Sequence, residues 1–183
     1  MTPEAPYQGK RAAPSDLLSA PDLCCLEATI SGMFPDVTQM GRDEFLDLMS
    51  TGETFVLLDV RRAAEYRVSR ISGSRRVAPA SRAQSVLRDL GPGSAALRII
   101  LYCSVGFRSS VLARRLQVAG FEGCANLSGG IFGWVNDGRA ALNDLGETSA
   151  VHPYSSIWQR FLRAPQVKPD PCSGKLVDRP GSI

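Results

Sequence analysis

The sequence has a single histidine, His152, and no apolar run long enough to cross a membrane. A membrane-spanning helix needs about 18 or more consecutive apolar residues. Residues 1–25 also lack the continuous apolar block of a secretory signal. A single histidine excludes a multi-histidine metal site. The number of cysteines, five, is odd, and their spacing is not that of metal ligands. We therefore expect no metal centre, no membrane association and a reducing, cytoplasmic setting.

Lysine is absent from residues 36–142, which hold fourteen arginines and ten acidic residues. The densest basic stretch, residues 61–76, contains six arginines, and its only acidic residue is Glu65. Such a cluster attracts small anions, but it lacks the interleaved aromatic residues that favour nucleic-acid binding. A solvated arginine-rich face is the simpler interpretation, and we expect no nucleic-acid partner.

Apolar runs and helical periodicity alternate along the middle of the chain. The spacing predicts strands over residues 55–60, 97–103 and 124–130. It predicts helices over residues 40–52, 63–71, 81–90, 109–121 and 131–142. Strands that alternate with helices indicate an α/β fold with a mostly parallel sheet.

Changes in composition divide the chain into four parts. These are an N-terminal extension (1–33), a globular domain (34–142), a C-terminal docking segment (143–164) and a proline-rich tail (165–183). In the docking segment, Trp158, Phe161 and Leu162 have helical spacing, so we expect them to pack the segment on the domain rather than bind a ligand. We expect His152 to be a packing or turn residue.

The stretch IILYCSVGFRSS, residues 99–110, places Cys103 at the end of a predicted buried strand. In open parallel sheets, ligands bind beyond the carboxyl ends of the strands. Gly106 permits a tight loop whose backbone N–H groups turn inward, and a helix starting near Ser109 adds the positive end of its dipole. Together with Arg108, these features predict an anion site that favours the thiolate form of Cys103.

Three segments, LLDVRRAAEYRVSRISGS, IILYCSVGFRSSVLARRLQVAGF and NLSGGIFGWVNDG, resemble the successive signatures of the rhodanese (sulfurtransferase) family over about residues 36–142. The resemblance implies a three-layer rhodanese-like α/β fold with helices on both faces of the sheet, and no cofactor. It also implies a reaction in which the cysteine takes the outer sulfur of thiosulfate or of a persulfide. The resulting cysteine persulfide then passes that sulfur to a thiophilic acceptor.

By this resemblance, Cys103 is the catalytic sulfur carrier. The residues expected to bind substrate follow it in the loop: Ser104, Val105, Gly106, Phe107, Arg108 and Ser109. Arg108 would favour an anionic donor such as thiosulfate, and Phe107 at the pocket mouth would favour a partly apolar acceptor. The implied partners are a small anionic sulfur donor and a thiol or cyanide-like acceptor, with a protein thiol as a further candidate.

Other positions match the family outside the cysteine loop. Asp59 and Arg61 are expected to brace the site from the end of the preceding strand. The closing segment, with Gly129, Gly130 and Trp134, is expected to shape its wall. One position departs from the pattern, since many family members have His where this chain has Arg70.

Three alternatives remain beside sulfur transfer. Related phosphatases and arsenate reductases place five residues between Cys and Arg, whereas four separate Cys103 from Arg108 here, which disfavours phosphoryl chemistry. A non-catalytic interaction or regulatory module is the second alternative, because fold alone does not determine function; inactive relatives usually lack the cysteine. The third is a buried structural cysteine without reactivity. The remaining cysteines, Cys24, Cys25, Cys124 and Cys172, have no spacing that recommends one as a second, resolving thiol.

Overall fold

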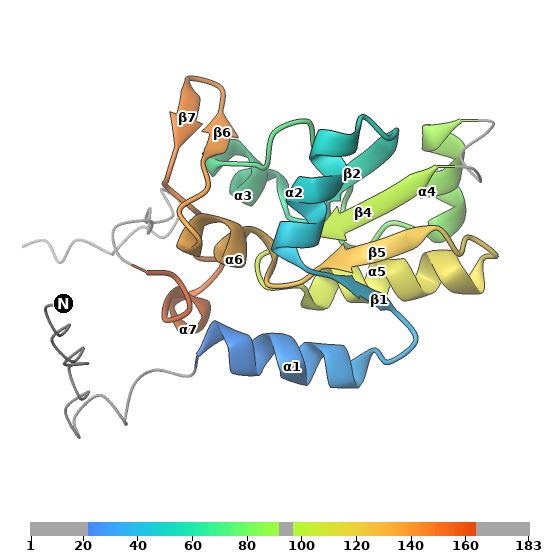
Figure 1. Cartoon of the computed structure of the whole chain (residues 1–183), viewed down its shortest axis with the longest axis horizontal. Helices are drawn as coiled ribbons and strands as arrows, with labels where there is room; N and C mark the ends of the chain where they lie inside the picture. Colours follow the sequence, from blue (N-terminus) through green and yellow to red (C-terminus); the bar gives the residue numbers. More distant parts are fainter. Residues whose placement is uncertain (1–21, 92–96, 164–183) are drawn as a thin grey trace, which may run out of the picture.

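The computed structural model describes residues 22–91 and 97–163, and Figure 1 shows a central sheet with helices packed around it. The expected tail at 165–183 and residues 1–21 of the extension lie outside the described residues. The strands are β1 (Thr38–Met40), β2 (Phe55–Asp59), β3 (Arg75–Arg76), β4 (Arg98–Tyr102), β5 (Cys124–Leu127), β6 (Ala141–Asn143) and β7 (Gly146–Thr148). The helices are α1 (Leu23–Met33), α2 (Arg42–Thr51), α3 (Ala63–Val68), α4 (Ala83–Leu90), α5 (Phe107–Val118), α6 (Gly130–Asn136) and α7 (Ser156–Gln159).

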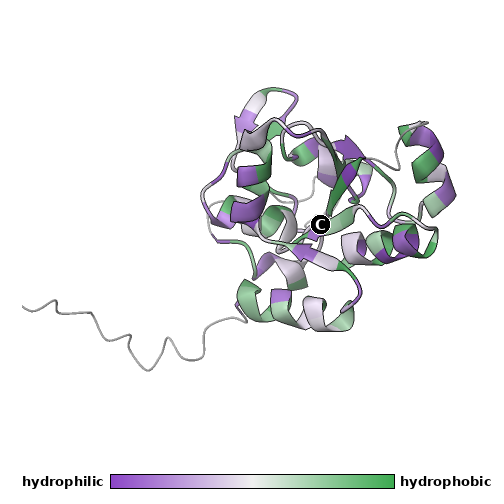
Figure 2. Ribbon diagram, turned by 45° about the vertical axis from the view of Figure 1, so that its right-hand side comes forward, coloured by the Kyte–Doolittle hydropathy of each residue, from purple (hydrophilic) through white to green (hydrophobic). Residues whose placement is uncertain are grey.

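The five strands of the central sheet are all parallel and have the order β1-β5-β4-β2-β3. In the middle strand β4, Ile99, Ile100 and Leu101 have no exposed surface. A continuous apolar strand is typical of a parallel sheet that is covered on both faces. Figure 2 shows this hydrophobic ribbon in green through the centre of the molecule. The predicted α/β class with a parallel sheet is confirmed.

Helices cover both faces of the sheet. On one face, α5 lies against β4 and β5, and α4 lies beside α5. Helix α1 runs alongside α5 (Figure 1). Next to the end of α1, the ring of Phe34 packs edge to face against Phe107, with 5.5 Å between the ring centroids. On the other face, α2 and α6 meet through Phe45 and Trp134, whose ring centroids are 6.0 Å apart. Since every strand points the same way, the ends of β2 and β4 reach the same edge, where Asp59 lies opposite Tyr102.

The structure differs from the predicted elements in several places. The last predicted helix, over residues 131–142, ends at Asn136, because Gly138 adopts a positive φ of 79° and turns the chain into the β6–β7 hairpin. The third strand ends at Leu127. Residues 23–33 of the extension form a helix that packs on the domain through buried Leu23 and Ile30.

Neither a membrane span nor a metal cluster occurs in the described part of the chain. None of its helices is long and apolar enough to cross a lipid bilayer. Within residues 22–91 and 97–163, no three His, Cys, Asp or Glu side chains are grouped so that they could hold a metal ion.

Candidate active site

Cys103 follows directly after β4, at the carboxyl edge of the sheet, and its residue is only 1% exposed. The backbone N–H of Gly106 donates a hydrogen bond to its Sγ at 3.2 Å. This bend requires Gly106 to adopt a φ of 109°, which glycine tolerates and other residues rarely do. A Cβ at this position would also come within 3.0 Å of the Asn126 amide nitrogen. The loop thus curls back on the sulfur, as its sequence predicts.

Helix α5 begins at Phe107, two residues earlier than the predicted start near Ser109. Ser109 is fully buried, and its hydroxyl donates to the carbonyl of Gly106 at 3.1 Å. The Ser110 hydroxyl donates to the same carbonyl at 2.8 Å. Ser109, which the resemblance implies as a substrate-binding residue, uses its hydroxyl in the contacts that secure the loop and does not line the pocket described below.

Helix α6 holds the cysteine loop from the opposite side. The N–H groups of Ile131 and Phe132 donate to the carbonyls of Cys103 and Ser104, each at 3.0 Å. In a trans peptide the N–H points opposite to the carbonyl, so the N–H groups that follow these two carbonyls are turned away from α6. The segment beginning at Gly130 therefore sets the orientation of the loop peptides.

Glu65 of α3 is one site residue that sequence reasoning missed. It is 1% exposed, and its carboxylate accepts hydrogen bonds from Arg108 at 2.8 and 2.7 Å and from the Ser104 hydroxyl at 3.1 Å. It also accepts the N–H of Arg62 at 3.0 Å, at the start of α3. The available signal was its position as the only acid among six arginines in residues 61–76.

The charges of Arg108 and Glu65 stabilise each other. Burial alone would raise the pKa of Glu65, but the hydrogen bonds and charge of Arg108 outweigh it and hold that pKa below its ordinary value. Burial would lower the pKa of Arg108, yet the carboxylate of Glu65 and the negative charge of a Cys103 thiolate raise it. Both groups are therefore ionised at neutral pH, and a negatively charged sulfur has a cation beside it.

A pocket of about 280 Å³ opens above the cysteine loop. Phe107, at its mouth, is 40% exposed, as the sequence predicts. Two of the lining residues come from the C-terminal docking segment, although Trp158 was expected only to pack that segment on the domain. Trp158 does both, since its ring also contacts Phe161, with 5.8 Å between centroids. The lining residues are Cys103, Ser104, Val105, Phe107, Arg108, Tyr154 and Trp158.

The expected supporting residues have different roles. Asp59 and Arg61 are both fully buried and form a two-pronged ion pair, in which Arg61 Nη2 lies 2.6 Å from Asp59 Oδ2. Arg61 Nη2 also donates to the Ser69 carbonyl at 2.6 Å. Trp134 instead packs in the core against Phe45, and its indole N–H donates to the Ala140 carbonyl at 2.8 Å. It does not line the pocket described above.

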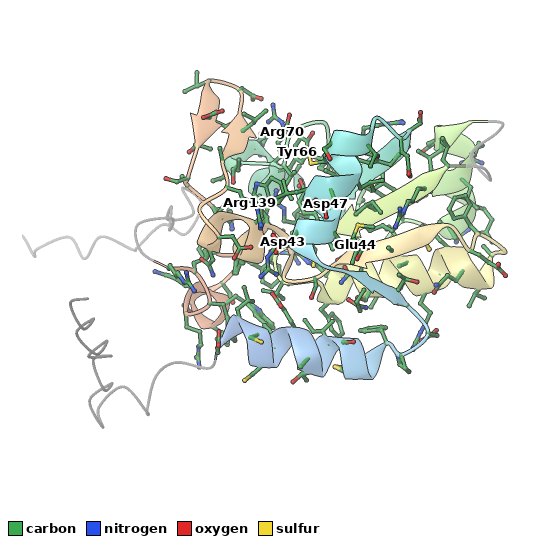
Figure 3. The ribbon with its side chains drawn as sticks, in the orientation of Figure 1. Asp43, Glu44, Asp47, Tyr66, Arg70 and Arg139 are labelled. Carbon is green, nitrogen blue, oxygen red and sulfur yellow. The ribbon has the colours of Figure 1, made fainter. Side chains whose placement is uncertain are left out.

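Arg70, the departure from the family pattern, connects α3 to the β6–β7 hairpin. Its guanidinium lies over the ring of Tyr66, 5.0 Å from the centroid, and Figure 3 shows the two side chains next to each other. It also pairs with Asp144 in the hairpin at 2.8 Å. Backbone hydrogen bonds of 2.7 Å run in both directions between Arg70 and Leu142. The contacts of Arg70 are therefore structural.

Fold and site together define a class of protein. It is an α/β domain with a cysteine at the carboxyl end of a parallel strand, and a backbone N–H of the following loop donates a hydrogen bond to the cysteine sulfur. The model of the Rhodanese-like domain family matches residues 41–137, which is more than half of the chain. This chain belongs to the rhodanese-like domain family.

Solved structures support the fold. The thiosulfate sulfurtransferase from Pseudomonas aeruginosa is 24% identical with a TM-score of 0.57, and the match covers 74% of this chain and 26% of that one. This chain therefore matches only about a quarter of that protein. The BH2092 protein from Bacillus halodurans is 22% identical with a TM-score of 0.51, covering 66% of this chain and 88% of that one. No curated protein sequence matches this chain.

Proposed function

We propose that this chain is a sulfurtransferase that carries a sulfane sulfur on Cys103, taking it from thiosulfate or a persulfide and passing it to a thiol or cyanide-like acceptor. The observation that carries the proposal is the hydrogen bond from the Gly106 N–H to Cys103 Sγ, 3.2 Å long, at the bottom of a pocket. An amide fixed beside the sulfur stabilises negative charge on a thiolate or on a bound persulfide. Membership of the rhodanese-like family and the likeness to a thiosulfate sulfurtransferase support it.

The reaction has two displacement steps at sulfur. The Cys103 thiolate attacks the outer sulfur of thiosulfate, which forms a sulfur–sulfur bond and expels sulfite with the electron pair of the broken bond. The acceptor thiolate then attacks the outer sulfur of the Cys103 persulfide. A new persulfide leaves on the acceptor, and the electron pair of the broken bond returns to Cys103 as thiolate, so no external oxidant or reductant is needed.

The second candidate is a non-catalytic interaction or regulatory module. The low exposure of Cys103, 1%, favours this alternative, because a sulfur donor must reach Sγ through the pocket. The two candidates differ in one measurable property, which is whether Cys103 accepts sulfur.

The test is the intact mass of the protein after incubation with thiosulfate or with an organic persulfide, followed by peptide mapping. Sulfur transfer predicts the gain of one sulfur atom on Cys103, and its loss on addition of cyanide. Cys103→Ser should abolish the gain. Cys124→Ser is the matched control, because burial raises the pKa of the Cys124 thiol to about 11 and keeps it protonated. A wild-type protein that takes up no sulfur from either donor would establish the non-catalytic module instead.

A further inference from the structure

The wall of the pocket includes a part of the chain that the family match does not reach. The match ends at residue 137, whereas Tyr154 and Trp158 line the pocket together with Cys103. The segment that supplies them is anchored on the domain by buried Val151, His152 and Leu162. This chain therefore adds its own aromatic wall to the family's cysteine loop.

Several contacts hold Tyr154 rigidly in place. It is the only non-glycine residue with a positive φ in residues 22–91 and 97–163, at 64°, and its N–H donates to His152 Nδ1 at 2.9 Å. The guanidinium groups of Arg108 and Arg62 lie 4.6 and 5.4 Å from its ring centroid. A strained residue held by several contacts is typical of a functional position. Because two arginines already occupy its ring by cation–π contact, Tyr154 is poorly suited to bind a cationic ligand.

Two polar side chains that line the pocket, Ser104 and Arg108, are already paired with Glu65 and with each other. The Ser104 hydroxyl donates to Glu65 and accepts from Arg108 Nη2 at 2.8 Å. The Arg108 guanidinium is neutralised by Glu65, and its side chain is only 19% exposed. The charged substituent of an acceptor thiol would have to give up its water without gaining an unpaired side-chain partner here, which is costly. Beside Cys103, the other lining side chains offer mainly aliphatic and aromatic surface to an acceptor: Val105, Phe107, Tyr154 and Trp158.

We infer that the sulfur acceptor of this protein is an uncharged, low-molecular-weight organic thiol, whose aryl or alkyl group packs against the aromatic wall formed by Phe107, Tyr154 and Trp158. The inference rests on the proposed function, and it names the acceptor class that the proposal leaves open. The thiol loses its proton to solvent and attacks the outer sulfur of the Cys103 persulfide. The products are an organic persulfide and the Cys103 thiolate.

The test compares acceptors on protein whose Cys103 persulfide has been verified by mass. Benzyl mercaptan represents the apolar class, 2-mercaptoethanesulfonate is a charged thiol, and cyanide is too small to contact the wall. Benzyl mercaptan should discharge the wild-type persulfide about tenfold faster than the charged thiol, as expected when one apolar group is recognised. Trp158→Ala and Tyr154→Ala should lower the ratio of the benzyl mercaptan rate to the cyanide rate about tenfold, whereas Trp158→Phe should retain most of it.

Ile157→Ala is the matched control, because Ile157 lies in the same short helix, is 62% exposed and does not line the pocket. It should leave the acceptor ratio at the wild-type value. Equal rates for the two thiols in the wild type would overturn the inference while leaving sulfur transfer intact. The inference would also be overturned if the charged thiol discharged the persulfide faster than benzyl mercaptan. The same holds if both alanine variants kept the wild-type ratio of the benzyl mercaptan rate to the cyanide rate.

A second readout separates failure of the inference from failure of the proposed function. Benzyl methyl sulfide, which has no thiol to react, should quench the fluorescence of Trp158 in unloaded protein, and the change should disappear in Trp158→Phe. Binding without any sulfur uptake by Cys103 would refute the proposed function but keep the apolar site. Sulfur uptake without binding would overturn the apolar site and keep the proposed function.

Discussion

Arg108 and Glu65 form a two-pronged ion pair beneath the pocket, with hydrogen bonds of 2.8 and 2.7 Å between the guanidinium and the carboxylate. The pair joins the cysteine loop to α3. Fork-to-fork geometry makes such hydrogen bonds stronger than neutral ones and fixes the direction of both side chains. Arg108 is thereby held in place by Glu65 as a positive charge near Cys103.

Glu65→Gln should lower the free energy of unfolding by about 2–3 kcal/mol at pH 7, somewhat less than for a fully buried pair because Arg108 retains partial exposure. The difference should shrink in acid. The pKa of Glu65 is held below its ordinary value of 4.5, so its ionised form stabilises the fold above that value. This stability is lost as the pH falls through the lowered pKa.

Urea unfolding of the wild type and the variant between neutral pH and pH 3 measures this effect. Glu122→Gln is the control, because Glu122 is exposed and its replacement should change stability by less than about 0.5 kcal/mol. A gap between wild type and Glu65→Gln that stays constant down to pH 3 would contradict the assigned ion pair.

The buried pair of Arg61 and Asp59 should not tolerate lysine in place of arginine. Arg61→Lys keeps the charge but loses the fork that bonds both Asp59 oxygens and the Ser69 carbonyl, and we expect a loss of about 3 kcal/mol in unfolding free energy. Chemical denaturation measures it. Arg98→Lys serves as the comparison, since that side chain is 44% exposed and its pairs with Glu44 and Glu53 are long, at 3.5 and 4.0 Å. Similar losses in the two variants would rule out a special role for the buried pair.

Gly130→Ala should be among the most damaging single substitutions in the domain. The added Cβ would clash with the carbonyl oxygen of Cys103 and lie 2.8 Å from that of Ser104, and backbone atoms cannot move aside cheaply. Gly138→Ala separates this clash from conformational strain, because Gly138 also has a positive φ but no atom within 4 Å of the added Cβ. We expect Gly138→Ala to lower the free energy of unfolding by about 1–2 kcal/mol from strain alone. Gly130→Ala should lower it clearly more, as measured by thermal or urea unfolding. Equal losses of stability in the two variants would show that the backbone of the cysteine loop can move to accommodate the added Cβ at residue 130.

The sequence by itself determined the strand, loop and helix that present Cys103. The apolar run before Cys103 predicts a buried strand, and Gly106 predicts the sharp turn that follows it. Each depends on residues that are neighbours in the chain, because backbone preferences and burial periodicity are local properties. Asp59 and Arg61 were expected at the site only because they match the family pattern; their strand, β2, pairs with β4 along the same sheet.

Only the tertiary structure decided which distant side chains complete the site. Glu65 reaches Arg108 from another helix, and Tyr154 and Trp158 reach the pocket from the C-terminal segment. Trp134, which the family pattern placed at the site wall, lies in the core against Phe45. Periodicity indicates that a side chain is buried but not which element covers it. That partner follows from how the helices and loops pack on the sheet, which no local pattern encodes.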